Sequence, residues 1–453
     1  MRKSLVLSVL GLWLIVSAGL FAAAQREAAA AEEEYPAGTM RFMGYGNPQV
    51  HEEYIDAFLD RNRDIAPNVR YETIHVESEA AARQQIIVSA TAGAWDDLPT
   101  AFRTQEVSMQ VMAEAGLLMD LTDFVTEHKE RFIDGAFSGL TYDGRYYAFP
   151  SQLKPQLVFY NVEIFDEYGI DPERMDTIEG WVEVGRELKE RSNGEVYLSY
   201  IDPGSYTWRY YGRRGFMPQA NARIWDDEGN VVIDTDPGAR MAFETLDTLY
   251  QEELLLRAPM FQPSLYDATR DGRIATYYIG AFWDQFLRQN LPDMEGKWRM
   301  MTAPMFESVG TRGAPVVALE SLPNPPGGNT YAGLYLEYLL DFQTNIDARI
   351  AWTESMLEQG QTVSAPITHE ALEDPYWRSP TPYYGGQSLL GMESDGLHNP
   401  SENLRVTTAD AEADAIISAE LEAYVAGDQT MEQAIANMGR VLRDRIGQAP
   451  PAR

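Results

Sequence analysis

Residues 143–169 read DGRYYAFPSQLKPQLVFYNVEIFDEYG, and this stretch decides the fold. Asp143-Gly144 lies between aromatic residues, which is a strong signal for a hairpin with a two-residue turn. An extended segment over 148–160 follows, and it is interrupted by Pro150 and Pro155. Proline donates no backbone hydrogen bond, so this segment is not an ordinary central strand.

On the N-terminal side, strand and helix patterns alternate. Apolar residues recur with a helical spacing at 49–63 and 78–92 and alternate in the strand segments that precede and follow these helices. This order implies a parallel sheet with helices on its faces, where ligands bind beyond the carboxyl ends of the strands. The five segments are a strand at 39–45, a helix at 49–63, a strand at 69–76, a helix at 78–92 and a short strand at 96–102. The relevant strand ends are then 44–47 and 102–106.

On the C-terminal side, helices dominate, and neither a fixed repeat nor a Gly-, Ser- or Pro-rich linker divides the chain. If two lobes are present, they therefore share crossing strands. Helices are predicted at 107–115, 179–191, 237–251, 330–343, 346–357, 409–424 and 431–446. Asn161 is predicted to cap a further helix that contains Ile164 and Phe165.

The composition excludes several classes of protein. The 453 residues hold 36 Lys+Arg against 69 Asp+Glu, a formal net charge of −33. Such a charge repels a phosphate backbone, which makes nucleic acid an unsuitable partner. The chain has no Cys, so disulfides, Cys-ligated zinc, iron–sulfur clusters and a lipid anchor on Cys are all excluded. With 45% hydrophobic and 11% aromatic residues, the chain should fold.

The N-terminus predicts export. Arg2 and Lys3 precede an apolar run over 5–21, and Ala22–Ala24 then supplies small residues for cleavage. We interpret 1–24 as a secretory signal peptide, with an uncleaved membrane anchor as the alternative, and 25–35 as a flexible tether. The mature protein is expected in a periplasm or secreted.

Several motifs, in sequence order, resemble one family. They are FLDRNRDIAPNV at 58–69, AGLLMDL at 115–121, the opening block at 143–169, DGRIA at 271–275 and IGAFW at 279–283. Together they resemble the extracellular solute-binding proteins of ABC importers, in the carbohydrate-binding group that includes maltose-binding protein. The resemblance covers roughly residues 38–446.

The resemblance implies an α/β, two-lobed periplasmic-binding-protein fold. Each lobe would be a mostly parallel sheet flanked by helices, and chain crossings would form a hinge. The first lobe would comprise 36–149 and 304–342, and the second 150–303 and 343–453. The implied function is capture of a sugar or oligosaccharide in an interlobe cleft by hinge closure, and delivery to an ABC permease. The resemblance also implies a monomer without cofactor or catalytic residues.

A sugar site needs aromatic planes and polar partners for hydroxyls. Trp283 matches the Trp of the family's Gly-x-Trp motif, and Tyr160 matches the Tyr of its Tyr-Asn pair, although core packing is the alternative for both. Tyr45 and Asn47 follow the first strand, where the family's first-lobe contacts lie.

The other candidate contacts come from regions that supply contacts in the family. They are Phe102, Arg103 and Gln105 after the third strand, Trp208 and Arg209 in an aromatic-basic patch, Arg312 between two glycines, and Trp377 in a loop. If the three arginines lie in the cleft, they favour an acidic sugar.

Two other functions remain open. One is an exported glycoside hydrolase that uses two carboxylates, although no G-x-S-x-G, H-E-x-x-H or P-loop motif is present. The other is binding of ferric iron by adjacent tyrosines, which occur at 146–147, 277–278 and 383–384.

Overall fold

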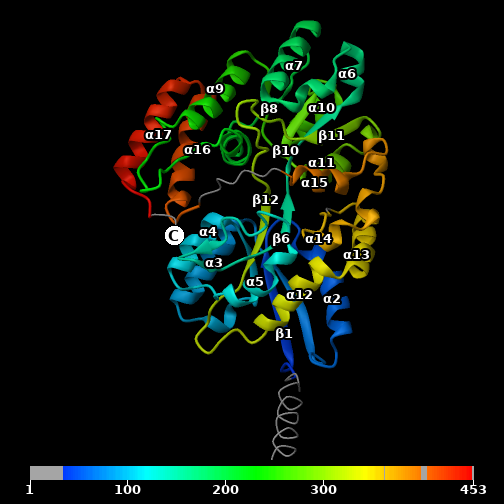
Figure 1. The fold of residues 1–453 in the computed structure, drawn as a ribbon, viewed down its shortest axis with the longest axis vertical. Coiled ribbons are helices and arrows are strands. Elements are labelled where there is room, and N and C mark those ends of the chain that lie inside the picture. Colours follow the sequence, from blue (N-terminus) through cyan, green and yellow to red (C-terminus); the bar gives the residue numbers. More distant parts are fainter. Residues whose placement is uncertain (1–33, 362, 399–405, 451–453) are drawn as a thin grey trace, which may run out of the picture.

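The computed structural model describes residues 34–361, 363–398 and 406–450. The predicted signal peptide and most of the predicted tether lie outside these residues. The described chain forms two lobes, drawn one above the other in Figure 1, and each is built around a sheet. No helix in the described ranges is long and apolar enough to cross a membrane.

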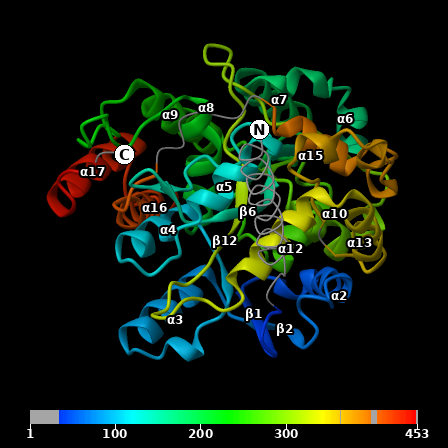
Figure 2. The same ribbon diagram turned by 60° about the horizontal axis from the view of Figure 1, so that its bottom comes forward.

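The first lobe contains a five-stranded sheet in the order β2-β1-β3-β12-β6. β1 pairs in parallel with both β2 and β3, as the alternating pattern predicts, and β12 pairs antiparallel with β3 and β6. The bounds are β1 (Gly38–Gly44), β2 (Val69–His75), β3 (Ala101–Thr104), β6 (Phe149–Lys154) and β12 (Val316–Ser321). Figure 2 shows α2 (Glu52–Arg61) and α3 (Glu79–Thr91) on opposite sides of β1 and β2. The sheet is therefore covered on both faces.

The strand predicted at 96–102 begins later than expected. β3 starts at Ala101, and a short 3₁₀ turn occupies Trp95–Asp97. Aspartate is depleted in strands, so the two acidic residues of this turn remain outside the sheet.

The second lobe repeats the same arrangement of strands. Antiparallel pairs join β7 to β10 and to β11, while β8 and β9 pair in parallel. A parallel bridge between Tyr197 and Ile274 connects the β8–β9 pair to β10. The bounds are β7 (Gln156–Asn161), β8 (Ser199–Ile201), β9 (Leu255–Arg257), β10 (Thr276–Gly280) and β11 (Trp298–Thr302). In each lobe one strand, β12 or β7, pairs antiparallel with both of its neighbours, so the sheets are mixed.

The remaining elements follow the predicted order. Asp143 and Gly144 have φ values of 48° and 74° in the turn between β4 (Thr141–Tyr142) and β5 (Arg145–Tyr146), which confirms the hairpin. The other helices are α4 (Glu106–Glu114), α5 (Thr122–His128), α6 (Val162–Tyr168), α7 (Ile178–Arg191), α8 (Met217–Gln219), α9 (Pro237–Gln251), α10 (Pro263–Arg270), α11 (Trp283–Asn290), α12 (Ala332–Thr344), α13 (Ile346–Glu358), α14 (His369–Leu372), α15 (Leu389–Gly396), α16 (Asp410–Ala426) and α17 (Met431–Arg445).

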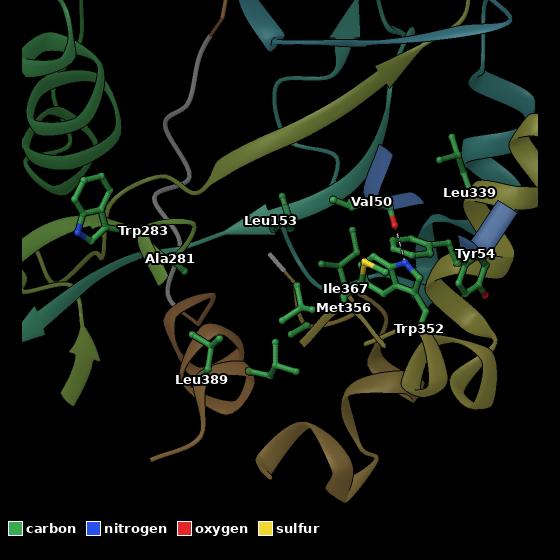
Figure 3. Packing of buried hydrophobic residues seen from close by; sticks show 14 of the residues in the cluster. Val50, Tyr54, Leu153, Ala281, Trp283, Leu339, Trp352, Met356, Ile367 and Leu389 are labelled. Atoms are coloured by element: carbon green, nitrogen blue, oxygen red, sulfur yellow. Dashed lines mark hydrogen bonds between the residues drawn. The ribbon is translucent and has the colours of Figure 1, made fainter. Parts of the chain in front are cut away.

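Helix α13 differs from the predicted lobe boundaries, which placed 343–453 in the second lobe. It packs against α2 and α12 of the first lobe. Trp352 is buried there, and its indole Nε1 donates to the carbonyl of Val50 at 2.8 Å (Figure 3). Its ring also stacks on His51. Burial of this aromatic side chain requires the first-lobe core, so the chain stays in that lobe beyond 343. The other boundaries remain predictions.

A buried ion pair joins the two lobes at the hinge. Lys154 ends β6, and its ammonium lies 2.5 Å from the carboxylate of Glu393 on α15, with both side chains almost completely buried. The second carboxylate oxygen accepts the backbone N–H of Ala365 at 3.1 Å. Burial raises the pKa of Glu393 although the Lys154 charge opposes this, so the carboxylate depends on its two partners.

Removal of Lys154 should leave the Glu393 carboxylate buried without a counter-charge. We expect Lys154→Met to lower the free energy of unfolding by about 3–5 kcal/mol, measured by urea denaturation. The double variant Lys154→Met, Glu393→Met should recover most of this loss, because two apolar side chains replace the pair. Equal stabilities of wild type and Lys154→Met would contradict this account of the hinge.

Candidate functional site

The carboxyl ends of β1 and β3 bring three predicted site residues together. The guanidinium Nη1 of Arg103 donates to the carbonyl of Tyr45 at 3.2 Å, and Gln105 Nε2 donates to the Tyr45 hydroxyl at 3.4 Å. All three side chains are half-buried. They come together because β1 and β3 are adjacent parallel strands, so their ends meet at one edge.

The second lobe meets this edge through a π-helix, labelled η5, over Thr207–Phe216. Its backbone bonds run from i to i+5, so side chains five residues apart share a side. Trp208 and Arg213 accordingly both bond the same oxygen of Asp414, at 2.8 and 3.0 Å. In an α-helix, residues with this spacing would lie about 140° apart around the axis and could not do so.

The same spacing directs Arg209 and Arg214 toward the first lobe. Arg214 makes a bidentate pair with Glu106 at the start of α4, with distances of 2.9 and 2.8 Å, and also donates to the carbonyl of Pro315 at 3.0 Å. Burial alone would raise the pKa of Glu106, but the Arg214 guanidinium outweighs it and holds that pKa below its usual value. This pair links the lobes beside the site.

Arg209 lies near Tyr45 of the other lobe. Burial raises the pKa of the Tyr45 hydroxyl, while the positive charges of Arg103 and Arg209 and the hydrogen bond from Gln105 oppose this rise. Arg209 also lies over the ring of Tyr210, with 5.8 Å from its guanidinium carbon to the ring centroid. We call Tyr45, Arg103, Gln105, Arg209 and Tyr210 the Tyr45 cluster.

Aromatic side chains of the second lobe continue from this cluster. Tyr210 stacks on Tyr206, with ring centroids 5.9 Å apart, and contacts half-buried Phe282 at 5.4 Å. Phe261 contacts both Tyr206, at 5.4 Å, and Trp283, at 5.7 Å. Aromatic rings thus connect the predicted contact Trp283 with the Tyr45 cluster.

Gln156 is a site candidate that the sequence analysis missed. It starts β7 directly opposite Gly280 and is 2% exposed, yet neither polar atom of its side-chain amide has a partner among the described residues. The indole nitrogen of Trp283, in a fully buried side chain, also lacks a partner there. Unpaired buried polar atoms are costly, so both suit a bound polar molecule. A glutamine between Pro155 and an apolar run was the available sequence signal.

A family comparison agrees with this architecture. Residues 21–341 match the model of the bacterial extracellular solute-binding proteins. The chain belongs to this family. The resemblance noted from the sequence motifs is therefore confirmed.

Curated relatives of this solute-binding protein match only part of it. The arabinooligosaccharide-binding protein of Halalkalibacterium halodurans is 28% identical over 205 residues, which is 44% of either chain. The protein of the same name from Bacillus subtilis is 20% identical over 205 residues, covering 44% of this chain and 45% of its own length. The alignments thus span less than half of these relatives.

Solved structures match almost the whole chain. The binding protein from B. animalis subsp. lactis in complex with β-1,6-galactobiose has a TM-score of 0.70 at 17% identity, covering 90% of this chain and 97% of its own. The sugar-binding protein MalE from Xanthomonas citri has a TM-score of 0.70 at 16% identity, with coverages of 90% and 97%. These likenesses confirm the predicted two-lobed fold.

Five predicted contacts of the solute-binding protein lie away from the Tyr45 cluster: Phe102, Tyr160, Trp208, Arg312 and Trp377. Phe102 is in the first-lobe core, and Trp377 is 1% exposed with its indole donating to Ala371 at 2.7 Å. Tyr160 lies four residues beyond Gln156 on β7, about 13 Å along the strand.

Arg312 is engaged within the second lobe. Its guanidinium pairs with Asp176 at 3.1 Å and donates to the carbonyl of Ala303. Asn47 instead lies near the site and donates to the Gln361 side chain at 2.6 Å, while the Gln361 carbonyl accepts from Arg288 of α11 at 2.9 Å. Asn47 thereby contributes to an indirect contact with the second lobe.

Trp208 lines a cavity rather than the Tyr45 cluster. This cavity of about 670 Å³ lies in the second lobe, and Trp225, Arg213 and Asp410 also line it. The Trp225 indole donates to Asp410 at 3.3 Å, and Trp208 and Arg213 bond Asp414. Since the protein itself supplies partners for these polar groups, this cavity is a weaker site candidate than the Tyr45 cluster.

Loss of the Glu106 charge should change how stability depends on pH. Because its pKa in the folded protein lies below the usual 4.5, the pair with Arg214 contributes fully above that value. The contribution is lost as the pH falls through the lower folded pKa. We expect Glu106→Gln to cost about 3–5 kcal/mol at neutral pH, with a cost that shrinks in acid.

Chemical denaturation at a series of pH values tests this expectation. Exposed Glu114 on the same helix provides the control, and Glu114→Gln should leave the stability nearly unchanged. A cost of Glu106→Gln that stays constant down to the acid limit of folding would show that the carboxylate charge is not the cause.

Proposed function

We propose that this protein acts outside the cytoplasm. There it captures a sugar or oligosaccharide between its lobes by hinge closure and delivers it to an ABC permease. The observation that carries the proposal is the Tyr45 cluster, which combines polar side chains of one lobe with a guanidinium and an aromatic ring of the other. No catalytic residue or cofactor is required, and a monomer suffices.

The chemistry of the cluster suits a saccharide. Aromatic rings such as Tyr210 and Phe282 can stack on the apolar face of a sugar, while guanidinium and amide groups bond its hydroxyls. A ligand that touches both lobes binds their closed arrangement better than a separated one. This difference in affinity is what drives closure.

The relatives support a saccharide as the solute. The two curated relatives are named for binding arabinooligosaccharides, and solved neighbours were crystallised with β-1,6-galactobiose and lacto-N-biose. A hydrolase would instead need two carboxylates free for acid–base work. Glu106, a buried carboxylate beside the cluster, is already paired with Arg214.

The structure gives no support to the ferric-iron alternative at the central tyrosine pair. Tyr277 and Tyr278 are fully buried, with hydroxyls bonded to Thr269 and Gln219. Burial raises the pKa of both hydroxyls and so disfavours the phenolate that iron would need.

A screen of saccharides by differential scanning fluorimetry tests the proposed function. Arabino-oligosaccharides, galactobiose, maltose and acidic saccharides are incubated with the protein, and chromatography monitors product. The ligand should raise the melting temperature, with about 2.7 kcal/mol of stabilisation at a hundredfold excess over Kd, and remain intact. Turnover would identify an enzyme and overturn the proposal.

The matched variant for this screen is Gln156→Leu. This substitution keeps a side chain of similar volume and removes the unpaired amide, so the free protein should be at least as stable as wild type. Ligand affinity should fall by about tenfold, since a polar contact to the ligand is lost. An affinity equal to wild type would remove Gln156 from the site.

A further inference from the structure

Two arginines of the Tyr45 cluster lack the ion pairs that Arg213 and Arg214 form among the described residues. Arg213 and Arg214 of η5 pair with Asp414 and Glu106, at 3.0 and 2.8 Å. Among the described residues, neither Arg103 nor Arg209 forms an ion pair. This is unexpected in a chain with 69 acidic residues against 36 basic ones.

Their hydrogen-bonding capacity is also largely unused. The buried Nε of Arg103 has no partner among the described residues, and its guanidinium makes one bond, to the Tyr45 carbonyl at 3.2 Å. In the same described part, the Arg209 side chain makes no hydrogen bond and contacts the face of Tyr210 at 5.8 Å. A guanidinium carries five donors, so both residues keep donors for a ligand.

Two carboxylates lie near the pair, and among the described residues neither forms an ion pair with Arg103 or Arg209. Glu320 lies opposite Arg103 in the β3–β12 register, and the Arg103 charge opposes the rise that burial causes in its pKa. Glu320 is buried and accepts its side-chain hydrogen bond from the Tyr335 hydroxyl, at 2.5 Å, rather than from Arg103. Glu79, at the start of α3, influences both Tyr45 and Arg209 electrostatically without forming an ion pair with Arg209 among the described residues.

We propose that the solute is an acidic saccharide, whose carboxylate binds between Arg103 of the first lobe and Arg209 of the second. This inference rests on the proposed function and narrows its substrate class. Half-buried guanidinium groups without counter-ions are partly dehydrated, and a carboxylate restores strong, charge-assisted hydrogen bonds to them. Because the two arginines belong to different lobes, the carboxylate also favours the closed arrangement.

The direct test compares acidic saccharides with neutral saccharides of the same backbone. Oligogalacturonates are titrated against oligogalactosides of the same linkage and length, and glucuronic acid-bearing xylo-oligosaccharides against unsubstituted ones, by isothermal calorimetry at neutral pH. At least one acid should bind ten times more tightly or better than its neutral counterpart.

Variants assign that preference to the arginine pair. Arg209→Gln and Arg103→Gln should each weaken binding of the acid tenfold or more and remove most of the preference over the neutral saccharide. Arg209→Lys should retain part of it, since the charge stays and the bidentate geometry is lost. Arg440→Gln, at an exposed position of α17, removes the same charge far from the cluster and should have no effect. Unliganded melting temperatures check that every variant is folded.

The outcomes separate this inference from the proposed function. If a neutral saccharide binds as tightly as its acidic counterpart, the acidic class is wrong while sugar capture stands. If acids are preferred but both Gln variants and Arg440→Gln behave alike, the carboxylate is bound elsewhere and the proposed pair is wrong. If no saccharide of either kind binds, the proposed function itself fails, and this inference with it.

Discussion

The bidentate pair between Arg214 and Glu106 fixes how the two lobes meet, and the i to i+5 spacing of η5 makes that pair possible. The same spacing directs Arg209 to the first lobe and leaves Trp208 and Arg213 on the opposite side, at Asp414. One helix therefore serves two surfaces. An α-helix of the same sequence would rotate these pairs apart and separate Arg209 from the interlobe side.

The net charge of the chain and the charge of the Tyr45 cluster have opposite signs. A net charge of −33 keeps the surface hydrated and repels anions at long range. Within about 8 Å, the Debye length at physiological salt, individual side chains dominate the electrostatic potential. At the Tyr45 cluster, Arg103 of the first lobe and Arg209 of the second form no ion pair with a carboxylate among the described residues. Composition thus describes the outer surface and says little about the solute.

Sequence periodicity predicted most of the fold and the first-lobe half of the site. Alternating strand and helix patterns placed Tyr45, Arg103 and Gln105 at adjacent strand ends, because parallel order fixes which ends meet. Periodicity could not separate Trp208 from Arg209, since a π-helix has no sequence signature distinct from an α-helix. It also could not locate Gln156, whose importance depends on having no partner in three dimensions.

The contacts between the lobes fall into two kinds, those whose charges are already paired and those whose donors are unpaired. At Lys154 with Glu393, and at Arg214 with Glu106, each charge already has its partner, so these pairs hold the hinge region together without a solute. At the Tyr45 cluster, donors of Arg103 and Arg209 are unpaired among the described residues, so apposition of the lobes there gains little by itself. A solute that supplies the missing acceptors adds free energy only at this second kind of contact. On the proposed function, a solute therefore contributes to closure at the Tyr45 cluster, while the paired charges are satisfied without it.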